Sequence, residues 1–219
     1  MTFRKIIATT ILATAIAWAL VGCAAKEEAP APVDAGKDAD TAEQVGTAEQ
    51  VDAAEHVAAC RVAMQKLGGA LKGRLQEAVA AGGLIEALEV CNVEAVPIAE
   101  TISIEEGVIV GRTSLRVRNP RNAPDAWERA TLEDFAARAG TVDDVGELEA
   151  WTVTENEQEQ KTFRYMRAIG TAPLCLSCHG EALTPEVTAK LAELYPADAA
   201  TGFAAGDIRG AFTIVKSID

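Results

Sequence analysis

The stretch Leu174-Cys175-Leu176-Ser177-Cys178-His179-Gly180 contains two cysteines and a histidine in the spacing C-x-x-C-H. On one turn of helix, two thiols at this spacing reach the two vinyl groups of a haem, and the adjacent imidazole is directed at its iron. We therefore predict one covalent haem c, attached through Cys175 and Cys178, with His179 as the proximal iron ligand.

Two other chemistries use paired cysteines of this kind. A redox dithiol also has the spacing C-x-x-C, but it has no need of the histidine that follows. A zinc site would require a fourth ligand from elsewhere in the chain. The motif therefore favours haem over both alternatives.

The first residues have the layout of a secretory signal, with Arg4 and Lys5 before an uncharged run over 6–25. Within this run, Leu20-Val21-Gly22-Cys23 resembles the bacterial lipobox, in which cleavage leaves the cysteine as a lipid-modified N-terminus. We predict a lipoprotein signal peptide over 1–22 and a lipid anchor at Cys23. The alternative is an uncleaved membrane helix, because the run is about long enough to span a bilayer. Both place the body outside the cytoplasm, as a periplasmic, membrane-anchored protein.

The following residues, 23–54, are rich in Ala, Glu, Asp and Pro and nearly lack large apolar side chains. Such a segment cannot bury enough surface to offset the entropy lost on ordering. We therefore predict a disordered tether over 23–54 and a globular domain over 55–219.

Helices are predicted before strands in the globular part. Apolar residues recur at helical intervals over 53–81 and 84–98, which predicts two amphipathic helices separated by Gly82-Gly83, with Pro97 bending or restarting the second. Alternating apolar residues and turn signals then predict the remaining elements. They are strands at 108–118, 149–154, 161–169 and 206–215, and helices at 125–139 and 184–194. This order favours an α+β fold with an antiparallel sheet.

The remaining sulfur and imidazole groups have competing interpretations. Cys60 lies on the apolar stripe of the first predicted helix, where a cysteine usually acts as a small buried hydrophobe. Cys91 lies on the buried face of the second, and spacing alone leaves it open between core residue and iron ligand. A disulfide between them is a further alternative in an oxidising compartment. Met166 is interpreted as strand packing rather than as a ligand, and His56 as a solvated side chain.

Charge and motif content narrow the function. With 33 acidic against 20 basic residues, the chain carries a formal charge of -13, which argues against a nucleic-acid partner. The globular part has no second histidine to act as a base, no Ser/His/Asp set and no phosphate-binding loop, so we predict that it is not an enzyme. Arg112, Arg118 and Arg209 are candidate partners for haem propionates.

Several short motifs carry a resemblance that covers about residues 60–219. They are Val90-Cys91 with Pro97-Ile98-Ala99, Arg112-Thr113-Ser114-Leu115, the run from Arg118 to Glu128, Cys175 to Gly180, Tyr195-Pro196-Ala197-Asp198, and Gly206 to Ala211. Through these motifs the chain resembles a family of extracytoplasmic single-haem c-type domains with a PAS-like fold, long catalogued as a domain of unknown function. The resemblance implies His/Cys axial ligation with Cys91 as the distal ligand, and it implies a sensory role.

Two functions remain open on this basis. The first is a redox or small-ligand sensor that responds to a diatomic gas; because the sequence ends at Asp219, directly after the last predicted strand, its signal would pass to an unidentified protein partner. The second is an electron-transfer lipoprotein whose acidic surface docks a basic partner. A structural or cargo-binding lipoprotein is a third, less specific alternative.

Overall fold

The computed structural model describes the backbone of residues 46–218 and the side chains of 53–218. Cys23, the predicted signal peptide over 1–22 and the predicted tether up to residue 45 lie outside this part. Helix α1 (Gly46–Glu106) begins inside the predicted tether, so the predicted boundary at residue 54 is wrong. Ala, Glu and Gln recur in this segment and favour helix even where large apolar side chains are few.

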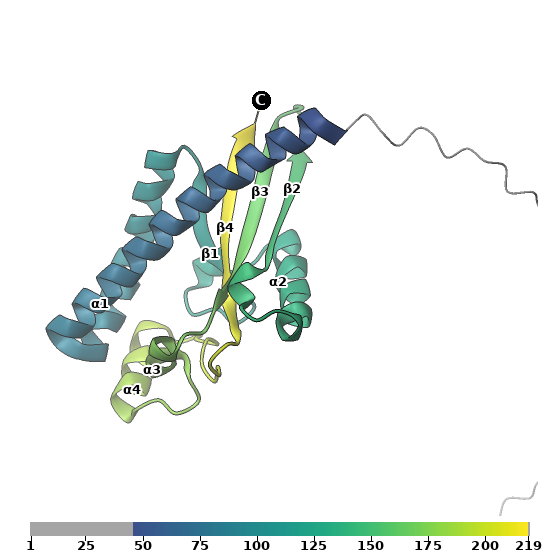
Figure 1. The fold of residues 1–219 in the computed structure, drawn as a ribbon. Coiled ribbons are helices and arrows are strands. Elements are labelled where there is room, and N and C mark those ends of the chain that lie inside the picture. Colours follow the sequence, from purple (N-terminus) through teal and green to yellow (C-terminus); the bar gives the residue numbers. More distant parts are fainter. Residues whose placement is uncertain (1–45, 219) are drawn as a thin grey trace, which may run out of the picture. The chain divides into compact units, whose positions relative to one another are not determined.

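Helix α1 is a hairpin of two arms that fold back on each other (Figure 1). Gly83 breaks the helical geometry with φ 74° and ψ -159°, a conformation that a residue with a Cβ rarely adopts. We call 46–82 the first arm and 84–106 the second arm. The predicted break at Gly82-Gly83 is confirmed, whereas the helix does not restart at Pro97, which lies inside it. The carbonyl that Pro97 cannot bond belongs to Val93, which is 68% exposed, so water can satisfy it.

The sheet has four antiparallel strands in the order β1-β4-β3-β2. They are β1 (Ile109–Thr113), β2 (Glu149–Glu155), β3 (Lys161–Gly170) and β4 (Ile208–Ile218). The predicted α+β class with an antiparallel sheet is therefore confirmed. Strand β1 ends at Thr113 rather than continuing to 118, because the Ser114 hydroxyl accepts from the Arg116 N–H and donates to the Arg209 carbonyl, which turns the chain out of the sheet.

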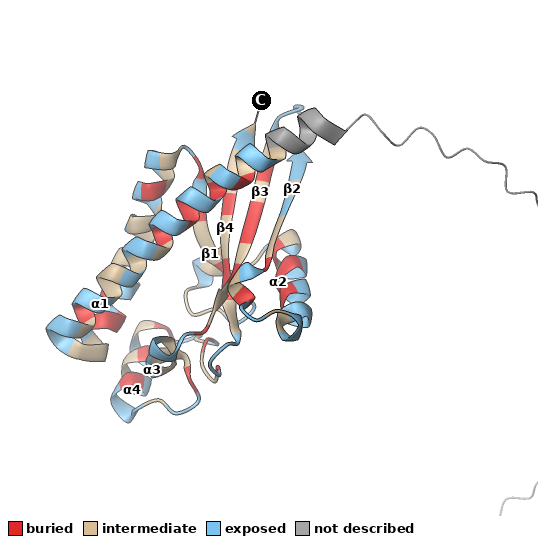
Figure 2. Cartoon of the chain, in the orientation of Figure 1, coloured by how far each residue is buried: buried red, intermediate tan, exposed pale blue. Residues whose placement is uncertain are grey.

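Helices cover both faces of this sheet, and the buried residues lie between the layers (Figure 2). On one face, α1 packs onto β3 and β4. That cluster includes Cys60, Met64, Leu67, Phe163, Tyr165 and Ile214. On the other face, α2 (Ala126–Arg138) contributes Leu132 and Phe135 to a cluster that contains Met166. Met166 is fully buried there, as its interpretation as strand packing requires.

The predicted motif lies beyond one end of the sheet, between β3 and β4 in the chain. It forms α3 (Leu176–His179), and α4 (Pro185–Leu194) follows it. Val187 and Leu191 of α4 pack on Leu88 of the second arm of α1. At the opposite end of the sheet, His56 lies against the ring of Phe163 and its Nδ1 is 3.1 Å from Lys216 Nζ, so the prediction of a solvated histidine is wrong. No helix in the described part of the chain is long and apolar enough to cross a membrane.

Candidate functional site

The two motif cysteines lie on a single short turn of helix. A 3-10 turn over Pro173–Cys175 leads directly into α3, so Cys175 and Cys178 are one turn apart, and both are partly exposed. Gly180 closes this turn, because its N–H donates to the Leu176 carbonyl at 2.9 Å. A Cβ at Gly180 would lie 2.6 Å from that oxygen, so a larger residue would push the turn open. The local sequence therefore fixes the spacing of the two thiols.

The imidazole of His179 is held by one backbone carbonyl. Its Nδ1 lies 2.7 Å from the Ala200 oxygen, and because a carbonyl only accepts hydrogen bonds, Nδ1 carries the proton. The lone pair of Nε2 is then available to a metal, which is the arrangement that metal-binding histidines usually have. Burial lowers the pKa of His179 to about 3, and the nearby cations of Arg209, Arg118 and Arg112 act in the same direction. The ring is therefore neutral at neutral pH.

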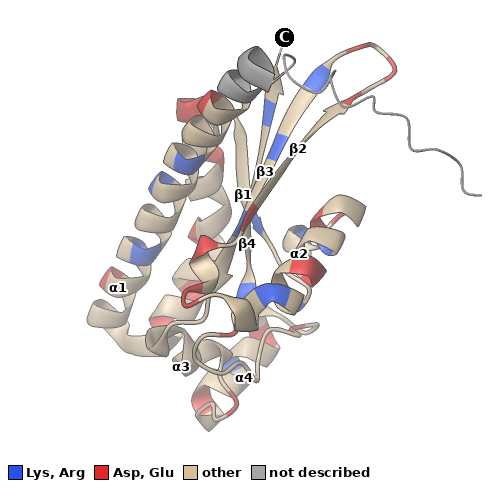
Figure 3. Ribbon diagram, turned by 45° about the vertical axis from the view of Figure 1, so that its right-hand side comes forward, with Lys and Arg blue, Asp and Glu red and all other residues tan. Residues whose placement is uncertain are grey.

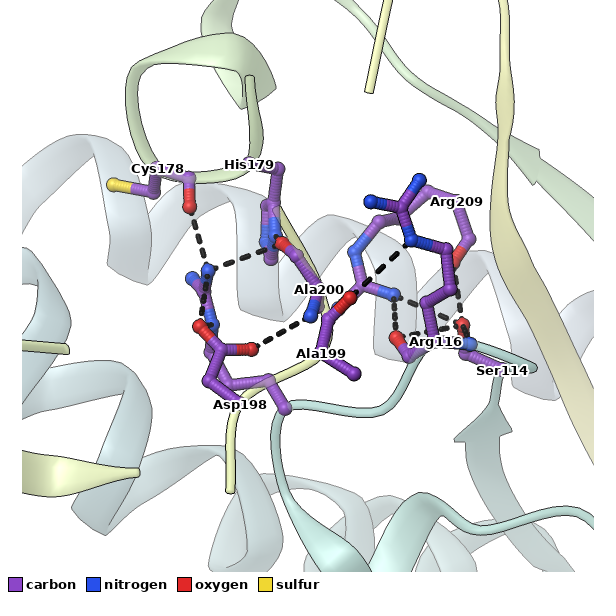
Figure 4. Close-up of polar contacts among 9 residues, drawn as sticks. Ser114, Arg116, Cys178, His179, Asp198, Ala199, Ala200 and Arg209 are labelled. Carbon is purple, nitrogen blue, oxygen red and sulfur yellow. Dashed lines mark hydrogen bonds and ion pairs between the residues drawn. The ribbon is translucent and has the colours of Figure 1, made fainter. Parts of the chain in front are cut away.

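Figure 4 shows Cys178, His179, Asp198 and Ala200 close together. Arg118 ties the motif to the loop that holds His179. Its Nη2 donates to the carbonyls of Cys178 at 2.6 Å and Ala200 at 3.2 Å, and its Nε donates to Asp198 Oδ2 at 3.0 Å. The other oxygen of Asp198 accepts from the Ala200 N–H at 2.8 Å. These contacts hold Arg118 between the motif, Asp198 and Ala200, and its role as a propionate partner stays a prediction.

Arg112 and Arg209 keep donors that have no hydrogen-bond partner among the described residues. Arg209 donates through Nη1 to Ser114 Oγ and the Arg116 carbonyl, but its Nε is buried and has no partner among the described residues. Burial lowers the pKa of Arg209 to about 10, and the cations of Arg118 and Arg112 lower it further. Arg112 forms no side-chain hydrogen bond or ion pair within 53–218, and burial lowers its pKa too. Two partly desolvated guanidiniums beside His179 therefore fit a bound anionic group such as a carboxylate.

The structure brings Cys91 to the motif. Its thiol lies close enough to Arg112 and Arg118 for their charges to lower its pKa, although burial has the larger effect and raises it. Burial raises the pKa of the Cys178 thiol, and Cys91 acts in the same direction. The prediction that Cys91 lies on a buried face is wrong, because its side chain reaches solvent where the second arm of α1 passes the motif, although the protein atoms around it still raise its pKa.

The two alternatives for the cysteines are not supported by the geometry. Cys60 and Cys91 are both free, and Cys60 is fully buried in the core between α1 and the sheet, so they do not form the disulfide considered above. Burial raises the pKa of Cys60 to about 11. Among the residues that the structure describes, no cluster of three or more His, Cys, Asp or Glu side chains is arranged to hold a metal ion, as the zinc alternative would require.

Two parts of this site were missed by the reasoning from residue chemistry. Asp198 and the Ala200 carbonyl complete the surroundings of His179, but neither belongs to a recognisable ligand pattern. The sequence feature that could have pointed to them is the motif Tyr195-Pro196-Ala197-Asp198. This motif contributed to the family resemblance but did not suggest a role for Asp198.

Known proteins match this chain in sequence and in fold. The family model described as Tll0287-like matches residues 29–217. Among solved structures, the cyanobacterial haem protein Tll0287 has 24% sequence identity to this chain and a TM-score of 0.50, and the match covers 79% of this chain and 98% of that chain. At this identity the likeness shows a shared fold. No curated protein matches the chain.

Proposed function

The chain belongs to the Tll0287-like family, which confirms the family resemblance found in its motifs, and we propose that it binds one haem c covalently. In this proposal, Cys175 and Cys178 would hold the haem through thioether bonds, and His179 and Cys91 would bind its iron. The observation that carries it is the hydrogen bond from His179 Nδ1–H to the Ala200 carbonyl, which presents Nε2 to iron. The neighbour Tll0287 is itself described as a haem protein. We also propose that the fold is PAS-like.

The chain's own residues would hold the haem in two ways. Arg112 and Arg209 would direct their unused donors at the propionates, and bidentate geometry suits guanidinium and carboxylate to each other. Leu84 and Leu88 of the second arm of α1 pack near Cys178 and would form an apolar wall beside the thioether. An apolar, partly closed wall is what a large planar cofactor requires on its non-polar edge.

We propose that the protein senses redox state or a diatomic gas and that it is not an enzyme. A bound haem supplies a one-electron couple and an iron that can accept a small ligand. The Cys91 thiolate would stabilise ferric iron and hold ferrous iron less tightly, since sulfur donates electron density. Because Cys91 is exposed on the second arm of α1, its release would free this arm to shift against the sheet. A protein partner would read that movement.

The alternative function is an electron-transfer lipoprotein. The charge of -13 would attract a basic partner, and acidic residues are spread over α1, α2, α4 and the loop between β2 and β3 (Figure 3). The two functions differ in whether Cys91 leaves the iron on reduction. A carrier would keep both ligands and show the same coordination in both redox states, whereas a sensor would open a site that carbon monoxide can occupy.

The central test is covalent haem attachment. The full chain, expressed with a cytochrome c maturation system, is expected to keep a haem-linked mass after denaturation. Cys175→Ala and Cys178→Ala should each weaken attachment, and Cys175→Ala/Cys178→Ala should abolish it. Cys60→Ala is the matched control, since Cys60 is buried away from the motif. Wild-type protein without haem-linked mass would contradict the proposal.

We also propose that Cys23 anchors the protein to the membrane on the periplasmic side. The proposal rests on the sequence Leu20-Val21-Gly22-Cys23. Cys23→Ser should abolish lipid labelling and release the protein from the membrane fraction. A mature wild-type protein that still begins at Met1 would instead indicate an uncleaved membrane helix.

A further inference from the structure

One carbonyl oxygen, that of Ala200, accepts from two side chains. His179 Nδ1 lies 2.7 Å from it and Arg118 Nη2 lies 3.2 Å from it. The same Arg118 nitrogen donates to the Cys178 carbonyl at 2.6 Å, so one guanidinium holds both the helical turn that carries His179 and the loop that receives its ring.

Asp198 makes this arrangement rigid. Its Oδ2 pairs with Arg118 at 3.0 Å, and its Oδ1 accepts from the Ala200 N–H at 2.8 Å, so Ala200 is held through both its N–H and its carbonyl. The side chains of Arg118 and Asp198 are only 11% and 9% exposed, which makes the pair far less screened than a surface ion pair. The energetic consequence is that loss of one partner leaves a buried charge without its counterpart.

The neighbouring arginines do not share this geometry. Arg116 donates to the carbonyls of Ala199 and Gly202 and lies over the ring of Phe203, and Arg209 bonds Ser114 and the Arg116 carbonyl. Neither bonds a residue of the C-x-x-C-H motif. A lysine at position 118 could not replace the guanidinium either. Its single nitrogen would have to donate to acceptors that arginine reaches from two separate nitrogens.

We propose that Arg118 is a positioning residue for the proximal histidine. By fixing the carbonyls of Ala200 and Cys178 relative to each other, it keeps the His179 ring in one orientation, with the proton on Nδ1 and the lone pair of Nε2 directed at the ligand site. The inference rests on the proposed function for its significance, since a histidine that binds iron needs one tautomer and one direction.

The first test uses the haem-loaded full chain. Arg118→Gln/Asp198→Asn removes both charges of the pair and leaves the net charge unchanged. The direct effects of the two lost charges on the iron therefore largely cancel. We expect its reduction potential to rise above that of the wild type, because a poorly held Nδ1–H bond makes His179 a weaker electron donor. Arg118→Lys should shift the potential in the same direction. A wild-type potential in the double variant, or full rescue by lysine, would overturn the inference.

The second test needs no haem. The chain has two histidines, so ¹⁵N spectra of the full chain expressed without haem maturation can be assigned with His56→Ala. His179 should show the Nδ1–H tautomer in the wild type and a mixture of both tautomers in Arg118→Gln/Asp198→Asn. Arg138→Gln, which breaks an exposed pair with Asp134 on α2, is the matched control and should keep the wild-type tautomer. An unchanged tautomer in the double variant would contradict the inference.

The two tests separate this inference from the proposed function. If the His179 tautomer depends on Arg118 but the protein never attaches haem, the positioning role is supported and the haem proposal is contradicted. If haem attaches but the tautomer and the reduction potential do not depend on Arg118, the haem proposal is supported and the positioning role is contradicted. Far-UV circular dichroism and the His56 signal establish that each variant is folded.

Discussion

The two arms of α1 each carry one cysteine, and the two cysteines have opposite environments. Cys60 on the first arm is fully buried among the apolar side chains that pack on the sheet. Cys91 on the second arm is exposed beside the motif, where Arg112 and Arg118 oppose the rise in its pKa. Two thiols on one helical hairpin are thus a core group and a candidate ligand. The surrounding residues, and not the residue type or the element, make the difference.

The largest expected effect concerns these two cysteines. Cys91→Ala should replace the thiolate-type ferric spectrum of the haem-loaded protein, admit added cyanide or imidazole and raise the reduction potential, because the sulfur ligand is lost. Cys60→Ala and Met166→Ala should leave the spectrum nearly unchanged, since both side chains belong to the core. Visible absorption of the three variants checks the comparison. An unaltered ferric spectrum in Cys91→Ala would remove Cys91 from the iron, and a changed one in Met166→Ala would favour the electron carrier.

A second effect tests whether the end of the sheet that α1 covers holds the fold together. Phe163 is fully buried there, and Phe163→Ala should lower the free energy of unfolding by about 3–5 kcal/mol through lost burial and a cavity. The control is Ile104, which is 83% exposed on the second arm. Ile104→Ala should change the free energy of unfolding by no more than about 0.5 kcal/mol. Urea unfolding followed by circular dichroism measures both. Equal losses in the two variants would mean that α1 does not pack on the sheet as described.

The smallest expected effect is a pH dependence of the free energy of unfolding that arises in the same core. Tyr165 donates to Glu149 at 2.6 Å, and Arg61 bonds the same carboxylate, which joins the first arm of α1 to β2 and β3. Burial and this hydrogen bond raise the pKa of Tyr165 from 10 to about 12. The neutral phenol is thus favoured in the folded state, so this contribution is complete below pH 10 and is lost as the pH rises toward 12.

We expect the wild type to lose about 2 kcal/mol more stability than Tyr165→Phe between pH 8 and pH 12, from the size of the shift. Urea midpoints at the two pH values measure this difference, and Arg138→Gln should behave like the wild type. The buried Cys60 thiol contributes a loss of the same sign in every variant, so only the difference between variants is informative. Identical alkaline losses in wild type and Tyr165→Phe would show that the phenol does not titrate with the fold.

Local patterns in the sequence determined most of the elements and the chemical type of the site. The helical intervals of α1, the break at Gly82-Gly83, the alternation of β3 and the single-turn spacing of Cys175 and Cys178 all involve residues close together in the chain. Their backbone geometry follows from that spacing, which is why they were predictable. The error at the end of β1 arose because the Ser114 hydroxyl in the following loop overrode the local signal. The helix continues through Pro97 because Val93, whose carbonyl Pro97 cannot bond, is exposed to solvent.

The tertiary structure alone decided the partners of the site. Arg118 meets Cys178 and Asp198 across separations of 60 and 80 residues, and the carbonyl for His179 comes from 21 residues further along the chain. These contacts exist because the strand order β1-β4-β3-β2 brings the segment after β1 and the segment before β4 to the same end of the sheet. The spacing of the motif thus specified which groups could bind a haem. The topology of the sheet decided which carbonyl, which arginine and which of the two α1 cysteines would stand beside them, because contacts between distant residues depend on how the strands pair and not on the local sequence.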